Sequence, residues 1–230
     1  MAGGGDLSLR VLAVGVLVAG IGAAQEQVSF ATEDGGVVYG DLYGKSERGV
    51  VLAHGGRFNK ESWAKQARVI ASAGFQVLAI DFRGYGRSRG PGQADPLSAP
   101  LDRDVLAAVR YLRKAGATTV SVVGASMGGE AAANASIESQ PGEIDRVVLL
   151  AGWTSREPEK IQGRKLFIVA RDDASGDGQP RLPSIRANYE RAREPKKLVI
   201  LNGSAHAQFL FSTDQAERVM REILNFLSEP

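Results

Sequence analysis

The chain has 230 residues, of which 43% are hydrophobic and 23% charged, and this is enough for one globular domain with a sizeable core. Its formal net charge is only +2, and no run of Lys and Arg is long enough to follow a phosphate backbone, so the sequence does not indicate nucleic-acid binding. The absence of cysteine excludes disulfides, thiolate metal ligands, a cysteine nucleophile and a bacterial lipoprotein anchor.

The N-terminal segment differs from the rest of the chain. Residues 11–24 are an unbroken run of apolar residues and glycine, shorter than the roughly 20 apolar residues that span a bilayer. The small residues at 22–24 suit cleavage by a signal peptidase after Ala24, so we expect a signal peptide at 1–24 and a secreted or periplasmic protein that starts at Gln25. The alternatives are a membrane anchor that is not cleaved and an extension packed on a cytoplasmic domain. Residues 25–230 are predicted to form a single domain that does not stay on a membrane once this segment is removed.

After this segment, apolar strands alternate with amphipathic helices. Strands are predicted at 27–31, 37–43, 49–53, 75–80, 120–123, 146–150, 165–170 and 197–201. Helices are predicted at 61–73, 101–115, 129–136, 184–193 and 214–227, and the Gly-, Pro- and Ser-rich stretch at 84–100 is predicted to be a loop. This alternation indicates a mostly parallel sheet with helices on both faces, and the first two strands form an antiparallel hairpin at its edge.

Reactive side chains in such sheets lie at the carboxyl ends of the strands. Residues 124–128 read Gly-Ala-Ser-Met-Gly between a predicted strand and an Ala-rich helix, which is the context of a nucleophile elbow. Glycines two positions either side leave room for a sharp turn that raises the Ser126 hydroxyl above the sheet. The helix N-terminus beneath it favours developing negative charge. The alternative is an ordinary Gly-rich loop.

Four motifs in chain order resemble those of the α/β-hydrolase superfamily. They are His-Gly-Gly at 54–56, Asp-x-Arg-Gly-x-Gly-x-Ser at 81–88, the elbow at 124–128 and Gly-x-x-His at 203–206. The resemblance covers about residues 27–228 and implies the α/β-hydrolase fold. The turn at 81–88 is predicted to brace the site rather than to act in catalysis.

Within that superfamily the chain resembles the small branch without a cap domain. Only residues 153–163 separate two predicted strands at the point where capped members carry a long insertion. The chain is therefore similar to dienelactone hydrolase-like proteins and small bacterial esterases. It departs from dienelactone hydrolase because Ser126 replaces a cysteine nucleophile. The serine also argues against the dehalogenase and epoxide hydrolase chemistry that the superfamily performs with an aspartate nucleophile.

A serine nucleophile needs a base that accepts its proton and a carboxylate that holds the base. Of the two histidines, His206 follows the last predicted strand, where the order Ser, acid, His places the base, whereas His54 is predicted to hold the oxyanion loop. Residues 170–173 match the family's Gly-x-x-Asp pattern with Ala in place of Gly, which selects Asp173 as the acid. The alternative acids are Asp172 and, less directly placed, Asp177, Glu157 and Glu159.

The resemblance also implies an oxyanion hole formed by the backbone amides of Met127 and Gly56, with the amide of Arg57 as the alternative to Gly56. The candidates for the substrate pocket are Arg57, Phe58, Trp153, Phe209 and Phe211, and packing in the core or at its edge is the alternative for the aromatic ones. Arg57, Arg87 and Arg89 either favour an anionic substrate or are solvated charges at the rim.

These residues predict a serine hydrolase, carboxylesterase-like, that cleaves an ester or related acyl bond of a small molecule through an acyl-enzyme intermediate. No cofactor is expected, and no cluster of His, Asp and Glu indicates a metal site. The alternatives are a peptidase or acyltransferase of the same fold, and a non-catalytic binding protein on this scaffold.

Overall fold

The structure is a computed structural model, and it describes Met1 and residues 25–92 and 99–229. The predicted signal peptide at 1–24 lies, apart from Met1, outside the described residues, so its cleavage after Ala24 stays a prediction. Within the described ranges, no helix combines the length and the apolar character that crossing a membrane requires.

An antiparallel hairpin forms one edge of the sheet, as the sequence predicts. Strand β1 (Gln25–Ala31) pairs with β2 (Val37–Tyr43), and β2 pairs antiparallel with β4 (Gln76–Ile80). The turn between β1 and β2 has Gly35 at φ +87°, a conformation that favours glycine. Because β2 runs antiparallel to β4, the hairpin joins the sheet without the helical crossover that parallel strands need.

The rest of the sheet is parallel. Its strands are β3 (Arg48–Ala53), β4, β5 (Thr119–Ala125), β6 (Arg146–Leu150), β7 (Arg164–Ala170) and β8 (Lys196–Leu201). The order across the whole sheet is β1-β2-β4-β3-β5-β6-β7-β8. The central strands are buried almost throughout because both faces are covered, which is why they read as continuous runs of Val, Leu and Ile.

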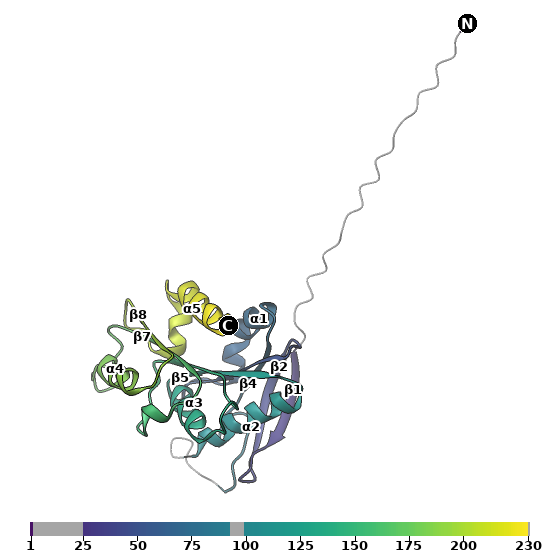
Figure 1. Cartoon of the computed structure of the whole chain (residues 1–230), viewed down its shortest axis with the longest axis horizontal. Helices are drawn as coiled ribbons and strands as arrows, with labels where there is room; N and C mark the ends of the chain where they lie inside the picture. Colours follow the sequence, from purple (N-terminus) through teal and green to yellow (C-terminus); the bar gives the residue numbers. More distant parts are fainter. Residues whose placement is uncertain (2–24, 93–98, 230) are drawn as a thin grey trace.

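Helices cover the sheet on both faces. Helices α1 (Ala64–Ser72) and α5 (Ala216–Ser228) lie on one face, and α2 (Leu101–Lys114) and α3 (Met127–Glu138) lie on the other (Figure 1). Helix α4 (Leu182–Arg191) packs on β7 and β8. Short 3-10 helices η1 (Lys60–Trp63) and η3 (Ala207–Ser212) follow β3 and β8. The predicted fold class, an α/β fold with a mostly parallel sheet, an antiparallel edge hairpin and helices on both faces, is confirmed.

The connection between β6 and β7 contains no cap domain. It runs from Ala151 to Gly163 and holds only the 3-10 helix η2 (Pro158–Lys160). The carboxyl ends of the neighbouring strands are therefore not covered by an insertion at this point.

A buried arginine fixes the turn that follows β4. The guanidinium of Arg83 donates to Asp34 in the hairpin turn at 2.7 Å and to Asp104 in the first turn of α2 at 2.6 Å. The hydrogen bond from Arg83 holds the pKa of Asp34 well below its ordinary value. The turn at 81–88 thus ties three separate parts of the chain together, which is the bracing role that the sequence predicts for it.

Two glycines let the elbow approach its neighbours closely. A Cβ at Gly124 would lie 2.1 Å from the carbonyl oxygen of Gly128, and a Cβ at Gly128 would lie 2.3 Å from the carbonyl oxygen of Ala53 on β3. These partners are backbone atoms, which cannot move aside as a flexible side chain can. The Gly-x-Ser-x-Gly pattern is therefore a packing requirement of the β5–α3 junction.

We expect Gly128→Ala to lower the free energy of unfolding by about 3 kcal/mol, because the added methyl overlaps the β3 backbone. Urea unfolding followed by circular dichroism measures this difference. Gly176→Ala is the matched control, since a Cβ there would meet no atom within 4 Å. Equal stability of the two variants would contradict the packing argument.

Candidate active site

Ser126 occupies a strained backbone conformation between β5 and α3. Its φ is 52° and its ψ is −114°, which a residue with a side chain rarely adopts. The surroundings hold it there: its amide donates to the carbonyl of Leu150 at 2.8 Å, and its carbonyl accepts the amides of Gly129 and Glu130. The sharp turn places the serine at the carboxyl end of β5 and at the N-terminus of α3.

The structure brings together three side chains that lie far apart in the sequence. The Ser126 Oγ lies 2.7 Å from Nε2 of His206, and Nδ1 of His206 lies 2.8 and 3.1 Å from the two carboxylate oxygens of Asp173. These partners assign the neutral tautomer in which Nδ1–H donates to Asp173 and Nε2 accepts from the serine hydroxyl. Asp173 is fully buried, whereas His206 is partly exposed. This arrangement can remove a proton from the serine and hold the resulting imidazolium.

The other acids that the sequence leaves open lie elsewhere. Asp172 is exposed, and its amide donates to the carbonyl of Gly203. Asp177 is also exposed and accepts a hydrogen bond from Ser175. Glu157 pairs with Lys160, and Glu159 pairs with Arg191. Of these candidates, the structure places only Asp173 against His206.

The second histidine, His54, holds the loop after β3 from inside the protein. Its Nδ1 lies 2.8 Å from the carbonyl oxygen of Gly55, and its Nε2 accepts the amide of Phe82 at 3.3 Å. Both contacts require the neutral ring with its proton on Nδ1. Burial lowers the pKa of His54 to about 4. A proton on Nε2 would face the amide of Phe82, so charging this ring would lose that contact, and a carboxylate oxygen of Asp81 lies 4.0 Å from that nitrogen.

Two amides beside the serine have no partner among the described residues, one in the loop after β3 and one at the start of α3. The carbonyl of Gly55 accepts from His54 and from the amide of Phe58, which fixes the Gly55–Gly56 peptide plane and hence the direction of the Gly56 N–H. The amide of Gly55 is already bonded to Gln208 at 2.7 Å. No hydrogen bond between described residues uses the amides of Gly56 or Met127. These two amides remain the predicted oxyanion donors.

A pocket of about 420 Å³ opens over the serine. Its walls are the loops that follow β3, β5, β7 and β8. The lining residues are Gly55, Gly56, Arg57, Phe58, Ser126, Met127, Ala174, Ser175, Gly176, Arg181, His206, Ala207 and Phe209. Phe58 and Phe209 contact each other edge to face in this lining, with ring centroids 5.0 Å apart. Arg57, Phe58 and Phe209 therefore line the pocket, as the sequence predicts.

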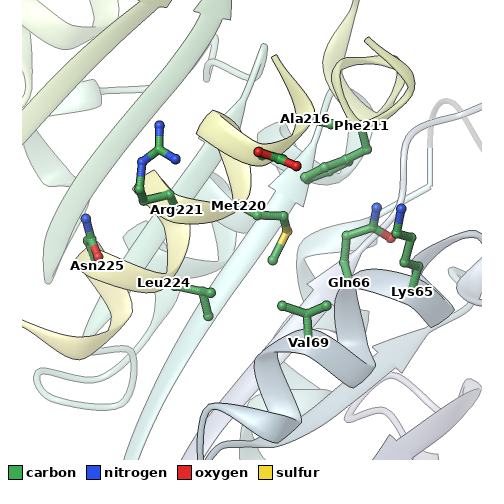
Figure 2. A pocket seen from close by; sticks show the side chains of 10 residues that line it. Lys65, Gln66, Val69, Phe211, Ala216, Met220, Arg221, Leu224 and Asn225 are labelled. Carbon is green, nitrogen blue, oxygen red and sulfur yellow. The ribbon is translucent and has the colours of Figure 1, made fainter. Parts of the chain in front are cut away.

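Two predicted pocket residues lie outside this lining. Trp153 is adjacent to the pocket-lining Arg181, whose guanidinium carbon is 5.6 Å from the indole centroid, but Trp153 is not itself part of the lining. Phe211 points into a separate hollow of about 370 Å³ between α1 and α5, together with Val69 and Met220 (Figure 2). Neither ring lines the pocket over Ser126, which leaves packing as the role of both: Trp153 contacts Arg181, and Phe211 packs edge to face on Trp63.

Two predicted rim arginines also lie outside the pocket. Arg87 stacks on Tyr39, with its guanidinium carbon 4.2 Å from the ring centroid. Arg89 donates to the carbonyls of Gly86 and Ser88 in its own turn.

Sequence reasoning missed three residues that shape the site. Tyr85 donates its hydroxyl to the carbonyl of Gly56 at 2.9 Å, and Gln208 links the oxyanion loop to the segment after His206. Arg181 enters the pocket because the loop after β7 folds back through a bridge between Ala174 and Pro180. A polar residue two positions after His206 is a weak signal for Gln208, but nothing in the sequence singles out Arg181.

Comparison with known proteins places the chain in a family. A sequence model described as alpha/beta hydrolase fold matches residues 49–184. The chain belongs to the alpha/beta hydrolase family. An esterase from Pyrococcus furiosus superposes on this α/β hydrolase with a TM-score of 0.73 and 18% identity, covering 89% of this chain and 92% of that one. A bromoperoxidase from Bacillus anthracis superposes with a TM-score of 0.70 and 17% identity, covering 89% and 100%.

The curated relatives of this α/β hydrolase carry several enzymatic names. A non-heme chloroperoxidase from Streptomyces lividans is 31% identical over 150 residues, which are 65% of this chain and 49% of that protein. The bifunctional epoxide hydrolase 2 of Sus scrofa is 37% identical over 81 residues, which are 35% of this chain and 14% of that protein. The matched parts thus span less than half of these relatives. The relatives include hydrolases, epoxide hydrolases and chloroperoxidases, and their names do not fix the reaction of this chain.

The described residues contain no group of three or more His, Asp and Glu side chains arranged to hold a metal ion.

We expect His54 to make the protein less stable as the pH falls from about 6.5 to about 4. In that window the unfolded chain binds a proton at the ordinary pKa of 6.5, but the folded chain does not until about 4. At pH 4.5 this costs the folded state about 2–3 kcal/mol. Urea unfolding of wild type and His54→Asn at pH 7.5 and 4.5 measures the difference, with His206→Asn as control. If wild type and His54→Asn lose equal stability on acidification, His54 is not buried neutral.

Proposed function

We propose that this α/β hydrolase is a serine hydrolase that cleaves an ester or related acyl bond of a small molecule. One observation carries the proposal: a continuous chain of hydrogen bonds runs from the buried carboxylate of Asp173 through His206 to the Ser126 hydroxyl, which faces a pocket. A hydroxyl activated in this way is a nucleophile for carbonyl carbon.

In the first half of the proposed reaction, Ser126 becomes acylated. Its Oγ bonds to the substrate carbonyl carbon while its proton passes to Nε2 of His206. The carbonyl oxygen takes the negative charge and is held by the amides of Met127 and Gly56, each worth on the order of 3 kcal/mol. Asp173 stabilises the imidazolium. When the carbonyl reforms, the bond to the leaving oxygen breaks, and His206 gives that oxygen its proton.

In the second half, water releases the acyl group. His206 takes a proton from the water as its oxygen bonds to the acyl carbon, and the same two amides hold the charge. Collapse of this intermediate breaks the bond to Ser126, which regains its proton from His206. The products are a carboxylic acid and an alcohol, and the site returns to its starting state.

Several observations favour ester hydrolysis over epoxide hydrolysis, peptide cleavage and binding without reaction. The nucleophile position holds Ser126, and not the aspartate that the family uses for epoxides. Peptidases of this fold usually restrict access with a cap, and the β6–β7 connection of this chain carries none. A complete and correctly oriented Ser–His–Asp set argues against a binding protein without activity. Comparing short acyl esters with aminoacyl amides tests the ester preference.

We expect Ser126→Ala to lower kcat for a p-nitrophenyl ester at least about 10⁴-fold, because the nucleophile is lost and only binding and the oxyanion amides remain. Steady-state kinetics measures this, and circular dichroism shows that the variant is folded. Ser204→Ala is the matched control, since that serine is exposed and outside the pocket. Comparable activity in both variants would remove Ser126 from the mechanism.

We expect Asp173→Asn to lower kcat by about 10⁴-fold, since the amide cannot hold the required tautomer of His206. Asp172→Asn is the neighbouring control and should stay within a few-fold of wild type, because that carboxylate is exposed. The same assay compares the two variants. If Asp172→Asn were the damaging change, Asp172 would be the acid.

A further inference from the structure

The pocket over Ser126 has an unbalanced charge. Two of the residues that line it, Arg57 and Arg181, are cations, and none of the lining residues in the described part of the chain is Asp or Glu. Two carboxylates lie near Arg181 but outside the lining. Asp173 is fully buried and bonded to His206, and Asp177 is exposed on the loop after β7, where a hydrogen bond from Ser175 lowers its pKa and the charge of Arg181 adds to this effect. The lining itself thus carries two positive charges and no negative one, which favours an anion in the pocket.

Arg181 is held in place by its backbone and carries unused donors. It directly precedes α4, and its amide donates to the carbonyl of Asp173 at 2.9 Å. Its side chain is 21% exposed, and its Nε is buried without a hydrogen-bond partner, 3.6 Å from a carboxylate oxygen of Asp173. Among the described residues, no carboxylate or carbonyl accepts a hydrogen bond from its terminal nitrogens. A mostly desolvated guanidinium with free donors at a pocket wall is a site for an anion.

Arg57 supplies the second cation from another loop. It follows the oxyanion loop residues Gly55 and Gly56, and its side chain is exposed. In the described part of the chain its guanidinium is in no salt bridge or hydrogen bond, unlike Arg87, which stacks on Tyr39. The two pocket arginines therefore reach the same space from the loops after β3 and β7.

We propose that Arg181 and Arg57 form a carboxylate subsite, so that the preferred substrates are small esters that carry a carboxylate group. This inference rests on the proposed ester hydrolysis for its reaction, but not for the binding of the anion. The guanidinium of Arg181 offers paired N–H donors that match a planar carboxylate. The carboxylate of the substrate accepts hydrogen bonds from the guanidinium of Arg181. Arg57, which is exposed at the rim of the pocket, adds electrostatic attraction for the same carboxylate.

A competing role for Arg181 is to brace Asp173 through the 3.6 Å contact. The two roles differ in what they predict. A brace acts on Asp173 and His206, so its loss slows every substrate equally. A carboxylate subsite acts on the substrate, so its loss slows anionic esters more than neutral ones of the same size.

The kinetic test uses the full chain and two pairs of esters matched in size. The pairs are monomethyl glutarate with methyl 4-carbamoylbutanoate, and acetoxyacetate with acetoxyacetamide, so that the charge lies on the acyl side in one pair and on the alcohol side in the other. The readout is the ratio of kcat/KM for the anion to that for the amide. We expect a ratio above about 10 for at least one pair, corresponding to one charge-assisted contact.

Variants separate the two roles of Arg181. We expect Arg181→Gln to lower this ratio at least about 10-fold, Arg57→Gln to lower it less, and Arg181→Lys to give an intermediate value because the charge remains without the fork. Arg87→Gln removes the same charge outside the pocket and should leave the ratio unchanged. Equal losses for both members of each pair in Arg181→Gln would assign the brace and overturn the subsite. A wild-type ratio near 1 for both pairs would also overturn it.

Binding gives a second readout that does not depend on turnover. In Ser126→Ala, isothermal titration calorimetry should show tighter binding of the anion than of its amide for the pair that wild type discriminates, and Arg181→Gln in that background should remove the difference. Equal binding of anion and amide for both pairs would overturn the subsite. If wild type hydrolyses neither the p-nitrophenyl ester nor any of these four esters, the proposed function fails, and this titration alone decides whether the anion is bound. If it hydrolyses the p-nitrophenyl ester but none of the four, the proposed function stands and the preference for anionic esters is overturned.

Discussion

The backbone conformation of Ser126 is the constraint on which the rest of the site depends. A residue with a side chain reaches φ 52° only when its surroundings hold it there, because this region is sterically unfavourable. The surroundings here are Leu150 on β6, the first turn of α3, and glycines that allow backbones to touch. Once that turn is formed, the serine hydroxyl projects above the sheet, and the loops after β7 and β8 need only deliver an acid and a base to it.

The two histidines show how the same side chain takes different roles according to its surroundings. His54 is buried, bonded on both ring nitrogens, and kept neutral by desolvation, so it serves as a fixed support for the oxyanion loop. His206 is partly exposed and lies between a hydroxyl and a carboxylate, which lets it accept a proton and keep its orientation. Exposure and partners, rather than residue type, therefore separate the structural imidazole from the one proposed to transfer protons.

The family comparison fixes the scaffold but not the reaction. Relatives that match this chain are named as chloroperoxidase and epoxide hydrolase, and a solved structure with a closely similar fold is an esterase. A shared fold holds different chemistry in its loops. In this chain the features that bear on chemistry are the serine at the elbow and a pocket whose lining contains two arginines and no carboxylate. The serine bears on which bond of the substrate is attacked, and the two arginines bear on the charge of the substrate.

Periodicity, glycine spacing and strand ends are local properties, so the order of the elements, the elbow and the candidate nucleophile and base could be predicted from the sequence alone. The Gly-x-x-Asp resemblance selected Asp173 and left Asp172 as the alternative, and the fold turns Asp173 into the interior and Asp172 to solvent. The sequence left Trp153 and Phe211 open between the pocket and packing, and it gave no signal for Arg181. These points depend on the packed fold, because the direction of a loop side chain is set by segments distant in the sequence that pack against it.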